Sequence, residues 1–158
     1  MSNETENDKT VLGKLETIKH IHRVRHFLSM MIEELDKRAR EHDLSKLESP
    51  EKEIFGEYTP ELAKVDYGTP EYQALLEKVK PAIEHHYSKN RHHPEFFDNG
   101  INGMDLCDLL EMICDWRAAT ERHKNGNILQ SIEFNAKRYG ISDQLTEILY
   151  NTAKNYFI

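Results

Sequence analysis

Residues 105–122 have the sequence DLCDLLEMICDWRAATER, and this stretch decides the fold class. Apolar residues fall on nearly every side of the helix that the stretch predicts from about Asp105 to Arg122. A helix of this kind lies at the centre of a protein and not on its surface. Asp115 lies within this apolar density, and a buried ionised carboxylate is costly unless it is paired or binds a metal. Asp115 therefore needs a partner.

Further helices are predicted on both sides of this stretch. From about Thr10 to Arg40 the apolar residues recur at steps of three and four, which predicts one long amphipathic helix. Two more helices are expected, from Ile128 to Tyr139, ended by Gly140, and from Ser142 to about Phe157. No segment alternates apolar and polar residues over a useful length. The sequence therefore predicts an all-α, single-domain bundle of about six to seven helices.

Three near-identical patterns predict helix starts in the middle of the chain: Ser49-Pro50-Glu51, Thr59-Pro60-Glu61 and Thr69-Pro70-Glu71. Each pattern has a capping hydroxyl, a proline at the first helical position and an acid in the first turn. The first two are expected to begin short helices over residues 51–58 and 60–65. The third begins a longer helix towards His86, with a kink or an end near Val79 because of Pro81. The segment 48–80 forms either a lid over a site or only packing.

Length and charge exclude several classes of protein. A chain of 158 residues fits one domain, which we expect to span residues 10–158 after a flexible terminus of residues 1–9. The formal net charge of −7 argues against a nucleic-acid partner, because phosphate binding needs clustered positive charge. No apolar run is long enough to span a membrane, and no signal peptide is present, so we expect a cytoplasmic protein. Cys107 and Cys114 are expected to be free, buried thiols.

Histidines are concentrated in one short block, 85–93, which contains His85, His86, His92 and His93. Short histidine-rich tracts are typical of metal sites. His86 and one or both of His92 and His93 are the favoured ligands, whereas His85 either packs or supports another ligand. Several histidines with aspartate, and no cysteine, predict one or two divalent ions per chain and leave Zn, Mn, Fe, Ni and Mg open.

Residues before and after this block complete the candidate site. His42 and Asp43 follow the long predicted helix, and such a pair is common at a helix end. Lys46 comes three residues after Asp43, where its ammonium could neutralise a phosphate oxygen. Alternatively the His-Asp pair occurs by chance and Lys46 is a solvated charge. Asp115 is favoured as a ligand, while Asp108 and Glu111 are expected at the surface or in support of a ligand.

The first predicted helix offers one more ligand. At 100° per residue, the centre of its apolar stripe lies near Leu28. His20 borders this stripe, His26 faces water, and His22 lies between the two. The helical wheel therefore favours His20 over His22.

Together these residues resemble the HD-domain superfamily of metal-dependent phosphohydrolases, over about residues 20–119. The resemblance rests on five segments of the sequence: His20-Ile21-His22-Arg23-Val24, His42-Asp43-Leu44-Ser45-Lys46, His86, His92-His93-Pro94-Glu95 with Asp98-Asn99-Gly100, and Ile113-Cys114-Asp115-Trp116. Ser45 stands where the superfamily usually has glycine. The chain is also similar, over nearly its whole length, to a family of small phage and bacterial proteins, through the segments 41–46, 92–95 and 111–116. This resemblance would place a phage-encoded chain in the host cytoplasm, and it supplies no substrate.

The resemblance implies two metal sites that share one carboxylate. One ion would be bound by His20, His42, Asp43 and Asp115, and a second by His86, His92 and His93 with Asp43 bridging. Asp43 and Lys46 would act in catalysis, and the substrate would be contacted by Lys46, Arg91 and Arg117.

The implied activity is hydrolysis of a phosphomonoester or phosphodiester by a metal-activated water. The expected substrate is a nucleotide or another small phosphorylated metabolite. The Gly-Tyr-Pro signature of cyclic-di-GMP phosphodiesterases is missing, since Gly100-Ile101-Asn102 stands in its place, so that specificity is not implied. Two alternatives remain: a metal-loaded nucleotide-binding or sequestering protein without turnover, and an HD-type di-iron oxygenase. A homo-oligomer is left open.

Overall fold

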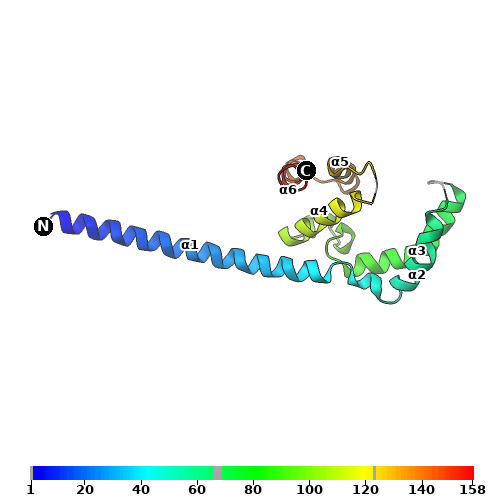
Figure 1. The fold of residues 1–158 in the computed structure, drawn as a ribbon, viewed down its shortest axis with the longest axis horizontal. Helices are drawn as coiled ribbons and strands as arrows, with labels where there is room; N and C mark the ends of the chain where they lie inside the picture. The colour runs from blue at the N-terminus through cyan, green and yellow to red at the C-terminus, as the bar shows by residue number, and fades with distance from the viewer. Residues whose placement is uncertain (1, 66–68, 123) are drawn as a thin grey trace. The chain divides into compact units, whose positions relative to one another are not determined.

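The computed structural model describes residues 2–65, 69–122 and 124–158, with side chains from residue 9 onward. Over these residues the chain is helical and contains no strand, which confirms the all-α prediction. The α-helices are α1 (Ser2–Glu41), α2 (Glu51–Leu62), α3 (Pro70–Lys89), α4 (Leu106–Thr120), α5 (Ile128–Tyr139) and α6 (Asp143–Tyr156) (Figure 1). Three short 3-10 helices connect them: η1 (Leu44–Leu47), η2 (Pro94–Phe96) and η3 (Gly100–Gly103).

The chain divides into two compact units, Met1–Arg40 and Glu41–Ile158. The first unit is formed by α1 alone, which is continuous, as predicted, and begins earlier than expected. The second unit contains all the other helices. The single domain of residues 10–158 and the flexibility of residues 1–9 stay predictions.

The hydrophobic core of the second unit is built by α4, α5 and α6. Eight buried residues form it: Met112, Ile113, Trp116, Ile128, Ile132, Ile141, Leu149 and Ala153. The rings of Trp116 and Tyr139 stack with centroids 6.4 Å apart, which joins α4 to the end of α5. One face of α4 thus lies in the core, and its other residues are available to a site.

Local signals in the sequence account for the ends of these helices. Asp105 accepts a hydrogen bond from the backbone of Asp108, and the Asp108 side chain accepts one from the backbone of Asp105, so the two form a reciprocal cap on α4. Gly140 ends α5 with φ of 61°, a left-handed conformation that glycine adopts without strain. The Ser142 side chain caps α6.

The helices α2 and α3 lie side by side (Figure 1). The predicted start at Thr69 is confirmed, because its hydroxyl accepts a hydrogen bond from the Tyr72 backbone at 3.2 Å. The predicted start at Pro60 is wrong. α2 continues through Pro60 and ends at Leu62, since a proline in the last turn of a helix removes only one of its backbone hydrogen bonds.

Of the two outcomes predicted near Val79, a kink or an end, the end is wrong. α3 continues through Pro81 to Lys89. Val79 and Ala82, on either side of the proline, are both buried. Their packing compensates for the hydrogen bond that Pro81 cannot donate, so tertiary contacts override a local helix-breaking signal.

Neither cysteine forms a disulfide, as predicted, but only Cys107 is buried, and Cys114 is exposed. Among the described helices, none combines the length and the apolar character that a membrane span requires.

Replacing Ile132 by alanine tests the core. Ile132 is fully buried in α5, so Ile132→Ala should lower the free energy of unfolding by about 2–5 kcal/mol in a denaturant titration. Phe134→Ala is the control on the same helix, because that ring is 65% exposed, and its loss should change stability by about 0.5 kcal/mol or less. Equal losses in the two variants would contradict the assigned core.

Candidate metal centre

The site begins where α1 ends. The helix stops at Glu41, and His42 and Asp43 form the turn before η1, which confirms the expected helix end. Asp43 has φ of 59° and ψ of 13°, and it is the one non-glycine residue with positive φ in the described chain. Aspartate tolerates this left-handed conformation better than most residues, but it remains uncommon. The turn directs the Asp43 carboxylate towards the histidines of the 85–93 block.

Glu111 of α4 orients two histidines. Its Oε1 atom lies 2.9 Å from His42 Nδ1 and 3.1 Å from His92 Nδ1. Each ring can donate its Nδ1 proton to this carboxylate, which leaves the Nε2 atom to bind another group. Histidines that bind metals are commonly oriented in this way by a carboxylate.

Glu51 of α2 orients a second pair of histidines, His85 and His86. It is fully buried, and its oxygens lie 2.7 Å from His85 Nδ1 and 2.9 Å from His86 Nδ1. The Ser45 hydroxyl also donates to Glu51 at 3.0 Å. His85 therefore supports the site through Glu51, one of the two roles expected for it, while His86 presents its Nε2 atom to the centre.

The Nε2 atoms meet at Asp43. Its Oδ1 atom lies 3.2 Å from His86 Nε2 and 3.5 Å from His92 Nε2. Its Oδ2 atom lies 3.5 Å from His42 Nε2, which is itself 3.7 Å from Asp115 Oδ1. The two oxygens of one carboxylate thus face two different sets of donor atoms.

His93 completes the first set, with its Nε2 atom 2.9 Å from that of His86. The described residues contain three groups whose potential ligand atoms all lie within 4.8 Å of one another: Asp43, His86, His92 and His93; His42, Asp43 and Asp115; and His42, His92 and Glu111. In the third group, His42 and His92 already contact Glu111 through their Nδ1 atoms, so this group needs no ion to explain it. The first two groups are the candidate ion sites.

Two atoms at the centre lack hydrogen-bond partners. Within the described residues, Asp43 Oδ1 and His92 Nε2 are buried and form no hydrogen bond. A buried polar atom without a partner costs roughly 1–3 kcal/mol, and a bound ion is one recognised explanation. Both atoms belong to the same four-residue group and lie 3.5 Å apart. The arrangement therefore fits a divalent cation bound by imidazole and carboxylate.

The electrostatics keep the carboxylates ionised. Burial alone would raise the pKa of Asp43, but His86 and Lys46 outweigh it and hold that pKa well below its usual range. Burial likewise opposes the effect of His42 and His92 on Glu111, whose pKa falls to about 2. The pKa of Asp115 is lowered despite its burial, chiefly by His42.

The histidines respond in opposite directions. Asp115 and Glu111 raise the pKa of His42 to about 10 against the effect of burial. Burial, together with the neighbouring His92 and His86, lowers the pKa of His93 to about 3, so its imidazole is neutral. Coordination through His42 Nε2 therefore requires a proton to leave, and metal binding to histidine is in general accompanied by proton release.

Ser45, at the position where the resemblance expects glycine, ties three elements together. Its hydroxyl donates to Glu51 and accepts from Asn90 Nδ2 at 2.8 Å. Asn90 also donates to the backbone oxygen of His86 at 2.8 Å. These bonds join η1 to the start of α2 and the end of α3, which keeps His86 in place.

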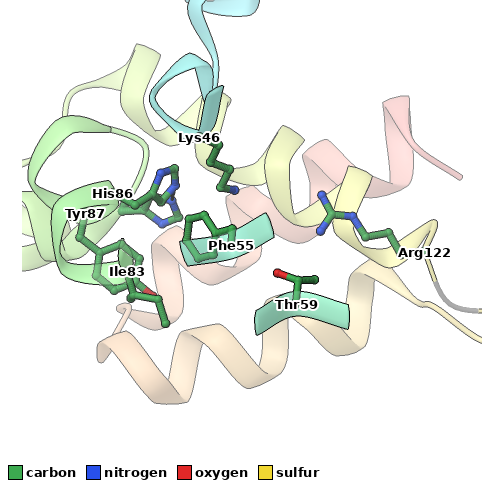
Figure 2. A pocket seen from close by; sticks show the side chains of 8 residues that line it. Lys46, Phe55, Thr59, Ile83, His86, Tyr87 and Arg122 are labelled. Carbon is green, nitrogen blue, oxygen red and sulfur yellow. Dashed lines mark hydrogen bonds between the residues drawn. The ribbon is translucent and has the colours of Figure 1, made fainter. Parts of the chain in front are cut away.

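Lys46 lies beside the centre and reaches a pocket of about 420 Å³ (Figure 2). Its Nζ atom donates to Asp43 Oδ2 at 2.6 Å, although η1 is a 3-10 helix and not the continuation of α1. Phe55 and Thr59 line the same pocket. The predicted segment 48–80 therefore contributes a wall to it, and movement of this segment as a lid stays a prediction.

Both arginines predicted to bind substrate have partners within the protein, and their part in substrate binding stays a prediction. Arg91 makes two hydrogen bonds to the fully buried Asp108, at 3.0 and 2.8 Å, so its guanidinium neutralises that carboxylate. Arg117 pairs with Glu121 at 3.0 Å and donates to the Phe157 carbonyl at 3.3 Å.

The structure brings most of the predicted ligands together. His42, Asp43 and Asp115 lie in one group and His86, His92 and His93 in another, so both alternatives in the 92–93 pair lie at the centre. His20 and His22 lie on α1 in the unit Met1–Arg40, and their part as ligands stays a prediction.

Sequence reasoning missed two residues, Glu51 and Arg122. Glu51 has the appearance of an ordinary first-turn acid, yet it is fully buried between histidines. Arg122 lines the pocket from just beyond the end of α4. The pattern around Glu51 is repeated at Glu61 and Glu71, so no local signal separates it from them.

Comparison with known proteins places the chain in a family. Residues 12–155 match the profile of a group described as "Family of unknown function (DUF5662)". The chain belongs to this family. No curated protein matches it, and neither does any solved structure. The family match spans nearly the whole chain but assigns no activity, so the activity has to be inferred from the chemistry of the site.

Replacing Glu111 tests whether the histidines are oriented for a metal. Glu111→Ala removes the acceptor of His42 and His92, so the affinity for a divalent ion should fall by about 10- to 100-fold in a calorimetric titration. Glu121→Gln removes an exposed carboxylate near the end of the same helix and should leave the affinity unchanged. An unaltered affinity in Glu111→Ala would contradict the assignment.

Proposed function

We propose that the protein is a metal-dependent phosphohydrolase that acts on a small phosphorylated metabolite, a nucleotide foremost. The observation that carries the proposal is the pair of ligand groups that share Asp43, beside a pocket lined by Lys46 and Arg122. A cationic side chain next to a metal-ligand cluster, and a second one in the same pocket, suit an anionic substrate. The resemblance to HD-domain phosphohydrolases supports the same ligand groups.

The site favours two ions over one. Asp43 Oδ1 faces His86 and His92, while Oδ2 faces His42, so Asp43 is suited to bridge. Three of the four residues in the first group are histidines, and imidazole favours Zn, Fe or Ni over Mg.

Divalent ions held there would lower the pKa of a bound water and neutralise charge on the phosphoryl oxygens. The protein's own groups orient the reactants. Lys46 uses one donor on Asp43 and, because an ammonium has three, can direct another at a phosphoryl oxygen in the pocket. Glu51 and Glu111 hold the histidine rings, which keeps the ligand geometry fixed during turnover.

Metal content tests the bridging role of Asp43. Elemental analysis should find two ions per wild-type chain, and Asp43→Asn should lose both because it weakens both ligand groups. His93→Ala belongs to one group only and should lose a single ion. A single ion in the wild-type protein, or equal losses in the two variants, would contradict a shared carboxylate.

Activity tests the function itself. Metal-loaded protein should release phosphate or nucleoside monophosphate from a panel of nucleotides and phosphoesters. His42→Ala and Asp43→Ala should reduce the rate to that of protein stripped of metal, because each removes a ligand. Glu133→Gln, an exposed site on α5, should retain the wild-type rate.

Other outcomes would identify the alternatives. Tight nucleotide binding without turnover, with Mn, Fe, Zn and Mg each tried, would indicate a binding or sequestering protein. Iron-dependent O₂ consumption would indicate an oxygenase. Hydrolysis that survives both His42→Ala and Asp43→Ala would exclude this centre as the site of reaction.

A further inference from the structure

The pocket beside the metal centre has two polar ends and an apolar middle. Eight residues line it: Lys46, Phe55, Thr59, Ile83, His86, Tyr87, His93 and Arg122. Its volume of about 420 Å³ lies within the range of sites for small ligands, about 300–1,000 Å³. Figure 2 shows His86 and Tyr87 on one side of this space and Arg122 on the other, with Phe55 between them.

The first end is the metal centre. His86 and His93 line the pocket, and both belong to the four-residue ligand group that includes Asp43. Lys46 lines it too, while it donates to Asp43. A reacting phosphoryl group would be bound at this end under the proposed function.

The middle is formed by Phe55, Ile83 and Tyr87. The Tyr87 ring packs on the ring of His93 with centroids 4.8 Å apart, so its position is fixed by the metal centre. Aromatic and aliphatic walls favour a flat or apolar body over a fully polar one, because burial of apolar surface stabilises the complex.

The far end carries one cation, Arg122. Arg91, Arg117 and Arg138 in the same unit pair with Asp108, Glu121 and Glu95 respectively. By contrast, no carboxylate among the described residues forms an ion pair with Arg122. Its guanidinium end is directed into the pocket space (Figure 2). A guanidinium binds carboxylate or phosphate through two parallel hydrogen bonds.

We propose that Arg122 is a specificity residue that binds a second anionic group of the substrate, distant from the phosphoryl group at the metals. The inference rests on the proposed function for the position of the reacting group. It narrows the substrate class to small phosphoesters that carry another acidic group, a carboxylate or a second phosphate, on a flat or apolar body. A phosphoester without a second acidic group would leave Arg122 solvated, and Arg122 would not contribute to its binding.

Matched aryl phosphates test the proposal. The probes are phenyl phosphate, its meta- and para-carboxylated forms, and its para-aminomethyl form, which differ in the charge at the far end. Wild-type protein should favour one carboxylated ester over phenyl phosphate in kcat/KM by about three- to tenfold, since a partly exposed ion pair is weak. Arg122→Gln should bring that ratio close to one, and Arg122→Glu should shift the preference to the aminomethyl ester. Lys137→Gln removes an exposed cation on α5 and should keep the wild-type ratio.

A binding measurement separates this inference from the proposed function. Phenylphosphonate and carboxyphenylphosphonate resist hydrolysis, so calorimetry with metal-loaded protein reports the same preference without turnover. Hydrolysis with no carboxylate preference, or with a preference that Arg122→Gln leaves intact, would overturn the inference and keep the function. If no ester is hydrolysed but the phosphonates show a preference that depends on Arg122, the inference stands and the proposed function is overturned.

Discussion

The candidate site depends on two carboxylates that orient its histidines. Glu111 accepts from Nδ1 of His42 and His92, and Glu51 accepts from Nδ1 of His85 and His86. The histidines come from the turn after α1, the end of α3 and the loop beyond it, whereas the carboxylates come from α2 and α4. The bonds that aim the Nε2 atoms at Asp43 therefore also hold these segments together. The same bonds thus serve both the packing of these segments and the geometry of the centre.

Much of the fold and of the candidate site could be predicted from the sequence, for physical reasons. The buried helix around Ile113 and the caps at Asp105 and Ser142 follow from periodicity and from short-range hydrogen bonds, which a sequence contains directly. The residues of the candidate centre could be singled out because few structural roles require four histidines in nine residues, or a carboxylate such as Asp115 in an apolar helix.

The rest depended on tertiary contacts. Glu51, Glu61 and Glu71 occupy the same place in three near-identical patterns, yet Glu51 is fully buried while the other two are exposed. Packing alone distinguishes them. Helix α3 continues through Pro81 because neighbouring contacts outweigh a local preference, and α2 continues through Pro60 because that proline lies in its last turn. The sequence also does not reveal that Arg91 and Arg117 are neutralised by carboxylates, because these ion pairs form only in the folded protein.

The charge of the centre constrains the order of events under the proposed function. Asp43, Asp115, Glu51 and Glu111 all have lowered pKa values and are ionised at neutral pH, in a chain of net charge −7. A phosphoester dianion would be repelled by such a group, because Lys46 is already paired with Asp43 and the protonated His42 offsets only one of the four negative charges. Cations must therefore be in place before the phosphoryl group arrives. Arg122, unlike Lys46, lines the pocket away from these carboxylates. Under the proposal it can therefore attract the second anionic group of a substrate before the phosphoryl group reaches the centre.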